Sequence, residues 1–171
     1  MKLVLRTCEV RSWQPSDVNA LVRHANNRNV AINLRDRFPS PYTPRDGRDF
    51  IKMARRMSPE SFFAIAVDGE AVGGIGFVLL QDLERVSSEV GYWLGESHWR
   101  KGIATEALVA ITRYAMVTHG FTRMFAVPFA YNDASCRVLE KAGYVLEARL
   151  RKSAIKDGRI IDQLQYAFVA P

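Results

Sequence analysis

Residues 90–105, VGYWLGESHWRKGIAT, hold the transition that decides the fold. An apolar strand pattern gives way to a short loop, and apolar residues at helical spacing begin at about residue 102. The first turn of a helix leaves backbone N–H groups unpaired and carries a partial positive charge, so it attracts anions. Gly102 and Ala104 keep bulky side chains away from those groups, and Arg100 and Lys101 add formal charge. This stretch therefore predicts a strand, a phosphate-binding loop and a helix in succession.

Two better-known phosphate motifs are excluded. The Walker A loop requires Gly-Lys followed by Ser or Thr, whereas Lys101 precedes Gly102 in this chain. The dinucleotide fingerprint requires three glycines between a strand and a helix, but no helical pattern follows Gly73, Gly74 and Gly76. We interpret these three glycines as the mark of an irregular strand.

A second motif, NDASCRVLEKAGY, occupies residues 132–144. Asn132 is placed to cap a helix, and Ser135 lies in the first turn of that helix. Gly143 ends the helical pattern before the next strand. Two helix starts that each follow a strand indicate a ligand that extends from one start to the other.

The rest of the chain alternates strand and helix patterns with short connections. Ser16 and Thr43 are the expected caps of the first two helices, and the polar, proline-bearing residues 26–42 indicate a loop between them. Asp-Gly steps at 68–69 and 157–158 are typical of hairpin turns. Strand patterns occupy 3–13, 62–67, 70–80, 86–94, 123–128, 144–151 and 160–169, and helical patterns occupy 16–25, 43–57, 102–118 and 133–142. The pattern predicts one mixed α/β domain over residues 1–171.

Composition excludes several classes of protein. Of 171 residues, 48% are hydrophobic and 25% charged, which is ordinary for a globular domain. No apolar run approaches the ~20 residues of a membrane span, and the first residues lack the apolar core and cleavage site of a secretory signal. Cys8 and Cys136 form neither a disulfide framework nor a metal-binding spacing. We expect a cytoplasmic protein with no metal and no membrane partner.

The charge is basic, with a formal net charge of +6, and ten of the eighteen arginines fall within the first 57 residues. A solvated surface, an acidic acceptor, a ribonucleoprotein neighbourhood and a polyanionic cofactor all fit this distribution. We do not expect a nucleic-acid partner, because the cations form no block with interleaved aromatic residues.

The segment 86–144 resembles the GNAT acetyltransferase superfamily, and within it the RimJ/RimL-like N-acetyltransferases. EVGYWLGESHWRKGIATEAL is similar to the strand, pyrophosphate loop and helix of that group, and NDASCRVLEKAGYVLEARLRKSAIKDGRIIDQLQYA to its second motif and closing hairpin. The likeness covers most of the chain from about residue 60 onward. It implies a mixed, mostly antiparallel central sheet flanked by about four helices. Acetyl-CoA would lie between two splayed parallel strands, here 86–94 and 123–128.

The resemblance also assigns the donor contacts. Backbone groups of the strand end would bind the pantetheine arm and thioester, the loop N–H groups would bind the pyrophosphate, and Asn132 would bond the pantetheine chain. The residues assigned to acetyl-CoA are Tyr92, Trp93, Leu94, Arg100, Lys101, Gly102, Ile103, Ala104, Thr105, Asn132 and Ser135. One departure is Trp99, which stands where the superfamily often has Gln or Arg.

Acetyl transfer requires a neutral amine, a polarised carbonyl and a stabilised thiolate. An α-amine, with a pKa near ~7.8, needs less help from a base than a lysine near ~10.4. Glu89 begins the strand stretch beside the thioester and is the predicted general base. Ser135 is predicted to donate to the departing sulfur or to a water, and the backbone N–H of Leu94 to polarise the carbonyl.

Two departures leave an alternative function open. Many relatives place a tyrosine acid where this chain has Leu139, and RimL-like enzymes place an acid where it has Ala154. Reserve candidates for proton transfer are Tyr131, Glu147, His98 and Tyr144. A catalytically weak CoA-binding module of the same fold is therefore the alternative to an N-acetyltransferase.

The acceptor amine is not defined by the sequence. A protein N-terminus, a polyamine, an amino acid and an antibiotic amine all remain open, as do a monomer and a homodimer. In this superfamily the loop between the first two helices flanks the acceptor, and here it carries Arg35, Arg37 and Phe38. Since arginine binds carboxylates with two parallel bonds, these residues predict a preference for acceptors with negative charge over polycations such as spermidine.

Overall fold

Two Asp-Gly turns set the antiparallel pairing in two parts of the sheet. Asp68 and Gly69 have φ angles of 49° and 83°, and Asp157 and Gly158 have φ angles of 50° and 73°. Positive φ at both central residues gives the turn whose twist matches that of two antiparallel strands, so both predicted hairpins are confirmed. The strands are β1 (Lys2–Val4), β2 (Glu9–Ser12), β3 (Phe62–Val67), β4 (Glu70–Leu79), β5 (Ser87–Leu94), β6 (Arg123–Ala126), β7 (Val145–Lys156) and β8 (Arg159–Val169).

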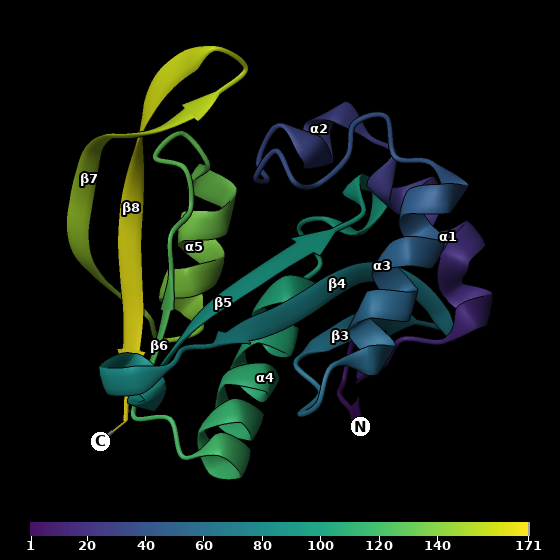
Figure 1. The fold of residues 1–171 in the computed structure, drawn as a ribbon, viewed down its shortest axis with the longest axis horizontal. Coiled ribbons are helices and arrows are strands. Elements are labelled where there is room, and N and C mark those ends of the chain that lie inside the picture. Colours follow the sequence, from purple (N-terminus) through teal and green to yellow (C-terminus); the bar gives the residue numbers. More distant parts are fainter. Residues whose placement is uncertain (171) are drawn as a thin grey trace.

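The computed structural model describes residues 1–170, whose strands form one sheet in the order β1-β2-β3-β4-β5-β6-β8-β7 (Figure 1). All neighbouring strands are antiparallel except β5 and β6, so the predicted mixed sheet with one parallel pair is confirmed. The parallel ladder runs only from Ser87–Arg123 to Glu89–Phe125. Beyond Glu89, β5 continues to Leu94, and within residues 1–170 no further β6 pairing follows. The two strands separate at this point.

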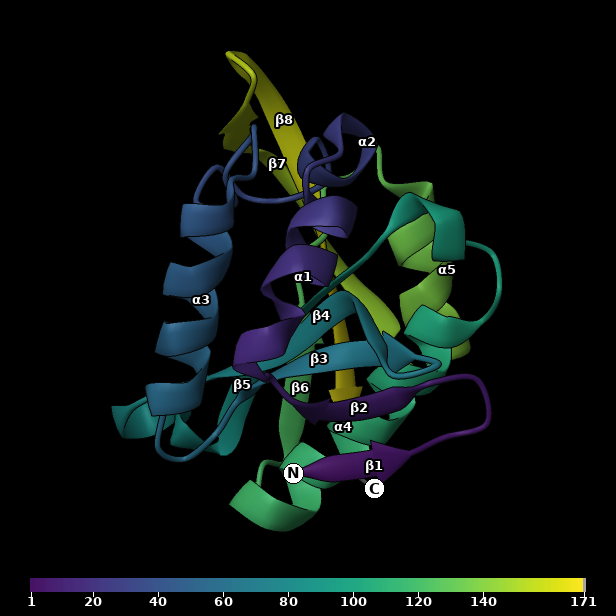
Figure 2. The same ribbon diagram turned by 90° about the vertical axis from the view of Figure 1, so that its right-hand side faces the viewer.

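Helices cover both faces of the sheet, with α1 and α3 on one face and α4 and α5 on the other (Figure 2). Residues 1–170 contain five α-helices where about four helices were predicted, because a short additional helix, α2, follows α1. No helix within residues 1–170 has the length and apolar character needed to cross a membrane. The helices are α1 (Val18–Ala25), α2 (Arg28–Ala31), α3 (Pro44–Arg56), α4 (Ile103–His119) and α5 (Asp133–Lys141).

Side chains of β3 alternate between two apolar clusters, one on each face of the sheet. Phe63 packs in the same cluster as Leu108 of α4, whereas Ala64 packs with Leu21 of α1. This period of two places Phe63 and Ile65 beneath α4, and Phe62 and Ala64 beneath α1 and α3. The alternation fixes which face of β5 points toward each helix layer.

The glycine cluster of β4 lies beside an irregularity in pairing, as predicted. The register between β3 and β4 shifts between Ile65 and Ala66, opposite Gly73. A Cβ atom at Gly74 would lie 2.7 Å from the indole nitrogen of Trp93, and one at Gly73 would lie 2.5 Å from the Trp93 carbonyl oxygen. Glycine is therefore needed here so that β5 and its tryptophan can pack closely on β4.

The prediction of a single strand over residues 3–13 is wrong, because the chain turns between β1 and β2. The backbone N–H groups of Arg6 and Thr7 donate to the carboxylate of Glu106, at 2.9 Å and 3.0 Å. A further bond from the Leu5 N–H to the Cys8 carbonyl closes the turn at 2.9 Å. The strand is interrupted by Glu106 of α4, which is distant in the sequence, so residues 3–13 themselves contain no pattern that predicts the turn.

The predicted cap at Ser16 is also wrong. A 3₁₀ turn over Pro15–Asp17 precedes α1, and Asp17 occupies the cap position without a side-chain cap bond. Its carboxylate instead accepts two hydrogen bonds of 2.8 Å from the buried guanidinium of Arg11. Leaving the buried guanidinium of Arg11 without a partner would cost more free energy than leaving the helix without a side-chain cap. The ion pair therefore determines the conformation of Asp17.

Residues 26–42 contain α2 rather than an uninterrupted loop. The side chain of Asn27 caps this helix by accepting the N–H of Asn29 at 2.8 Å. The start of α3 is confirmed, since Thr43 and Asp46 exchange side-chain and backbone hydrogen bonds in a capping box. Asx caps occur in turns as well as helices, which is why the local pattern did not reveal α2.

Candidate active site

The candidate site is the gap that opens where β5 and β6 separate. Tyr92, Trp93 and Leu94 pair with β4 on one side and border the gap on the other. The Gly95 N–H donates toward β4, to the Val72 carbonyl at 2.8 Å. Because neighbouring residues of a strand alternate in direction, the Leu94 N–H points into the gap. The three residues predicted to contact the pantetheine arm thus lie along one edge of this gap.

The start of α4 presents open backbone N–H groups, as its sequence predicts. Gly102 occupies the cap position with φ 79°, and no side chain caps the helix. The N–H groups of the first turn, which includes Ile103, Ala104 and Thr105, have no intrahelical acceptor. A Cβ atom at Gly102 would meet no atom within 4 Å. An exposed helix start of this kind suits an anionic group, and Arg100 and Lys101 are exposed beside it.

Trp99, which stands where the superfamily often has Gln or Arg, has a structural role in the loop between β5 and α4. Its indole N–H donates to the Leu94 carbonyl at 2.7 Å and so closes this loop. The next residue, Arg100, adopts a left-handed conformation with φ 62°. Trp99 therefore fixes the backbone path that brings the chain to the open helix start.

The start of α5 faces the same gap. The Asn132 side-chain oxygen accepts the Ser135 N–H at 3.1 Å, so the predicted cap is confirmed. The Ser135 hydroxyl lies 2.8 Å from the Tyr92 hydroxyl, which also lies 3.2 Å from the Ser135 carbonyl oxygen. These contacts join β5 to α5 across the gap and hold Ser135 beside the residues predicted to bind the thioester.

The Tyr92 side chain is the member of the site that sequence reasoning missed, because only its backbone was assigned a role. Burial raises the pKa of the Tyr92 phenol, so the group stays protonated at neutral pH. The period of two was the available signal. It places Tyr92 on the same face of β5 as the buried Val90 and Leu94, toward α4 and α5.

Glu89 projects from the opposite face of β5 at the last rung of the parallel ladder. Its carboxylate forms an ion pair with the guanidinium of Arg35, from the segment between α2 and α3. The predicted base and a predicted acceptor residue are thus in direct contact.

A hollow of about 240 Å³ lies next to this pair, between the α2–α3 segment and the β7–β8 hairpin. The position at which RimL-like enzymes would carry an acid, Ala154, is part of its wall and supplies no carboxylate. The residues that line it are Arg35, Asp36, Phe129, Ser153, Ala154, Ile155, Lys156 and Gln163.

The α2–α3 segment is fastened over this hollow by two hydrogen bonds. Lys156, whose side chain is buried, donates to the exposed Asp36 at 2.8 Å. Tyr131, just before α5, donates to the Ile32 carbonyl at 2.6 Å. The segment is therefore held in place to shape the approach to Glu89.

The other two residues predicted to contact the acceptor lie elsewhere. The Phe38 ring packs against the rings of Tyr42 and Trp93, with centroids 5.0 Å and 5.6 Å apart, within the apolar cluster under α1 and α3. Arg37 is exposed and does not line the hollow. Of the three residues predicted to contact the acceptor, Arg35 lines the hollow, whereas Arg37 and Phe38 do not.

Leu139 and both cysteines are buried in the core. Leu139 is fully buried. Because this residue is a leucine where many relatives place a tyrosine, α5 offers no phenol at that position. Cys8 and Cys136 are both free and buried, and burial raises the pKa of Cys8 to about 11. Among residues 1–170 no group of three or more His, Cys, Asp or Glu side chains is arranged to hold a metal.

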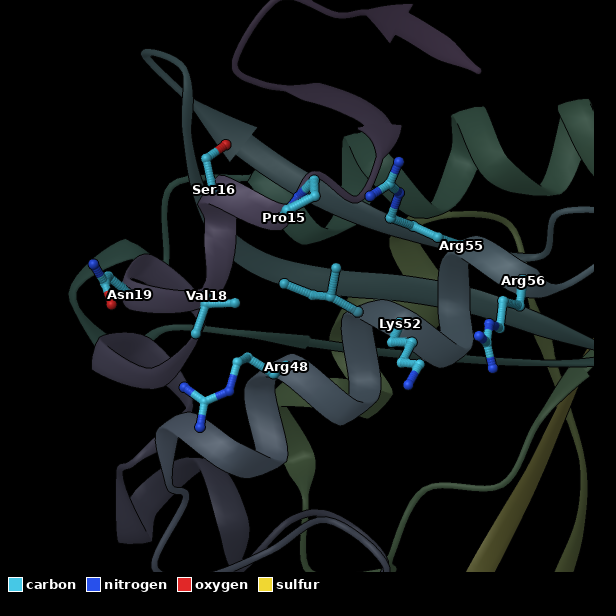
Figure 3. Close-up of a pocket in the computed structure, with 9 residues that line it drawn as sticks. Pro15, Ser16, Val18, Asn19, Arg48, Lys52, Arg55 and Arg56 are labelled. Atoms are coloured by element: carbon cyan, nitrogen blue, oxygen red, sulfur yellow. The ribbon is translucent and has the colours of Figure 1, made fainter.

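A larger hollow of about 690 Å³ lies apart from the gap, between α3 and the chain that leads into α1 (Figure 3). Four cationic side chains project from α3 along it, and none forms an ion pair with another part of the chain that the structure describes. These four residues, called here the α3 cations, are Arg48, Lys52, Arg55 and Arg56.

Comparison with known sequences gives one family. Residues 8–145 match the family described as an acetyltransferase (GNAT) domain. The chain is 36% identical over 102 residues to an uncharacterized N-acetyltransferase, YoaA, of Bacillus subtilis, a match covering 60% of this chain and 57% of the relative. It is 31% identical over 106 residues to the ribosomal-protein-serine acetyltransferase of Escherichia coli, covering 61% and 58%. The chain thus spans little more than half the length of these two relatives.

The fold is similar to that of solved acetyltransferases. The superposition on Mycobacterium smegmatis RimJ in complex with CoA-disulfide has a TM-score of 0.88 at 23% identity, and it covers 99% of this chain and 87% of that one. At this identity, the likeness establishes a shared fold.

Proposed function

We propose, because this chain belongs to the GNAT acetyltransferase family, that it transfers the acetyl group of acetyl-CoA to a primary amine. The observation that carries this proposal is the gap between β5 and β6, with two helix starts beside it. A gap of this kind suits an extended ligand that has phosphates at one end and a reactive thioester at the other.

The donor side of the gap fits acetyl-CoA. The open N–H groups at Gly102 and the adjacent Arg100 and Lys101 would hold the pyrophosphate. The free edge of β5 would pair with the pantetheine amides, and the Asn132 side-chain nitrogen, which donates to no other described residue, would do so from α5. The CoA-bound structure of RimJ supports this choice of donor.

The chemistry requires that the amine lose a proton as it attacks the thioester carbonyl. Glu89 would accept this proton, and the Leu94 N–H would stabilise the developing oxyanion. The bond between carbon and sulfur then breaks, and the hydroxyl of Ser135 would donate to the thiolate that leaves. An acceptor carboxylate that takes the guanidinium of Arg35 would also free Glu89 to meet the amine.

The acceptor would enter through the hollow beside Arg35. A protein N-terminal α-amine and a small-molecule amine both fit this entrance. The E. coli relative is named for a ribosomal protein, which supports a protein as the acceptor. An α-amine also needs less help from Glu89 than a lysine, because its pKa is lower.

A second candidate is a module that binds CoA without efficient turnover. It is favoured by the buried Leu139 and by Ala154, since both stand where an acid or phenol is expected in related enzymes.

Two measurements separate these candidates. Acetyl-CoA binding is measured by isothermal titration calorimetry, and thiol release is measured with peptides and small amines, with products identified by mass spectrometry. Binding together with acetylated product supports the enzyme, and binding without product from any amine supports the module. Absence of acetyl-CoA binding contradicts both.

A further inference from the structure

The contact between Tyr92 and Ser135 consists of hydrogen-bonding groups and orients the serine hydroxyl as well as packing β5 against α5. Ser135 has a polar neighbour at three atoms. Its N–H donates to the Asn132 side chain, and the single hydroxyl of Tyr92 lies 2.8 Å from its hydroxyl oxygen and 3.2 Å from its carbonyl oxygen. A serine hydroxyl normally rotates freely to suit its surroundings. Here the phenol removes that freedom at the residue predicted to meet the leaving sulfur.

We propose that Tyr92 is the positioning residue for acetyl transfer, because its phenol donates to the Ser135 oxygen and leaves the Ser135 hydroxyl proton free to point at the departing thiolate. This inference rests on the acetyl transfer proposed above. It assigns the side chain of Tyr92 a role separate from that of its backbone.

The direction of the hydrogen bonds follows from the charges involved. When the carbon–sulfur bond breaks, both its electrons stay on sulfur, which becomes a full negative charge beside the Ser135 hydroxyl. The Ser135 hydroxyl then donates to sulfur, and its oxygen accepts from Tyr92. A phenol buried away from water remains protonated and is available as that donor. Bonds arranged in such a chain strengthen one another.

All protons in the proposed reaction are accounted for without ionisation of Tyr92. The amine proton passes to Glu89, the new bond joins nitrogen to the acetyl carbon, and the thiolate takes its proton from water after release. Tyr92 and Ser135 keep their own protons and act through hydrogen bonds alone.

The position of Tyr92 also accounts for the absence of a phenol within α5. Leu139 fills that place in the core, and the hydroxyl pair reaches the start of α5 from β5 instead. The chain offers a matched comparison in Tyr166 of β8. This residue is also buried and reaches α5, but it donates to Glu140 near the opposite end of the helix, at 2.9 Å.

The experiment is a double-mutant cycle on the full chain. Tyr92→Phe, Ser135→Ala and the double variant are compared for kcat and for KM toward acetyl-CoA, with an acceptor that the wild-type protein acetylates. We expect Tyr92→Phe to lower kcat about tenfold with little change in KM, since one hydrogen bond is lost. In the Ser135→Ala background, the same change should cost nothing more. Tyr166→Phe, the control, should keep the wild-type kcat.

Other outcomes overturn the inference. If the losses from Tyr92→Phe and Ser135→Ala multiply, or if kcat is unchanged in Tyr92→Phe, Tyr92 does not act through Ser135. Thermal melting checks that each variant folds, and Tyr92→3-fluorotyrosine serves if Tyr92→Phe does not. That change alters phenol acidity at nearly constant shape, so an unchanged kcat would contradict the proposal. A wild-type protein that acetylates no amine refutes the proposed function together with this inference, whereas wild-type turnover with an insensitive Tyr92 refutes the inference alone.

Discussion

Arg35 and Glu89 form an ion pair at the point where β5 and β6 separate, although they stand 54 positions apart in the chain. The segment between α2 and α3 thereby reaches the predicted base of the reaction. Because Glu89 projects from the β5 face opposite Tyr92, the acceptor and the leaving thiolate would be served from the two sides of one strand. In the proposed reaction, charge recognition and proton acceptance would be coupled at this ion pair.

The first prediction separates the two arginines of that segment. Arg35→Ala should remove the preference for acceptors that carry a carboxylate, lowering their kcat/KM relative to neutral amines by roughly 10-fold or more, the value of a charge-assisted hydrogen bond. Arg37→Ala should leave the ranking as it is, since Arg37 does not line the hollow. The measurement is kcat/KM for acidic, neutral and basic amines. Spermidine as the best substrate, or an unaltered ranking in Arg35→Ala, would show that this view of the acceptor is wrong.

The second prediction concerns the base. Glu89→Gln should lower kcat by about 100-fold or more, the usual contribution of a general base, and should leave acetyl-CoA affinity nearly unchanged. Glu84→Gln is the control, because it makes the same charge change on an exposed 3₁₀ turn before β5. Steady-state kinetics and calorimetry give the two quantities. Full activity in Glu89→Gln would mean that positioning alone drives the reaction.

The third prediction tests the phosphate site with two glycines of one helix. Gly102 and Gly120 begin and end α4, both have positive φ, and a Cβ atom at either would meet nothing within 4 Å. Gly102→Glu and Gly120→Glu therefore impose similar backbone strain. Only Gly102→Glu places a negative charge among the predicted phosphate contacts, so it should weaken acetyl-CoA binding by ~10-fold to ~100-fold. Equal affinity in the two variants, measured by calorimetry, would rule out this location.

The fourth prediction concerns pH and stability. Hydrogen bonds from the hydroxyl of Thr7 and from the backbone of Arg6 and Thr7 lower the pKa of Glu106 below its usual value of 4.5. A lowered pKa in the folded state stabilises the protein above the unfolded value, and this contribution is lost as pH falls toward the folded value. Glu106→Gln should therefore lower Tm near neutral pH, and its difference from the wild type should shrink below about pH 4.5. A Tm difference that is constant with pH would contradict this origin.

Features set by short stretches of sequence could be predicted. The Asp-Gly hairpins, the caps at Thr43 and Asn132 and the span of β3 depend on residues within a few positions of one another. The open start of α4 belongs to the same class, because Gly102 and the residues around it define it locally.

Features that depend on strand order could not be predicted in the same way. Glu106 bends the chain between β1 and β2 from 99 positions away, and Tyr92 meets Ser135 only because β5 lies beside β6. Alternation along β5 gives the direction of the Tyr92 side chain, but not the identity of its partner. Such contacts follow from the register of the whole sheet, which no local pattern records.

The α3 cations have a consequence for any ligand screen that reads thermal shifts. Arg48, Lys52 and Arg56 stand at four-residue intervals on α3, where like charges repel across one helical turn. Counterions that gather there relieve this repulsion, so sulfate, phosphate or heparin should raise the melting temperature with the candidate site empty. CoA itself carries phosphates. The change in melting temperature that it causes would therefore combine binding in the gap with binding of its phosphates at the α3 cations. Arg48→Ala combined with Arg56→Ala should reduce the response to sulfate and leave the part of the CoA shift that belongs to the gap.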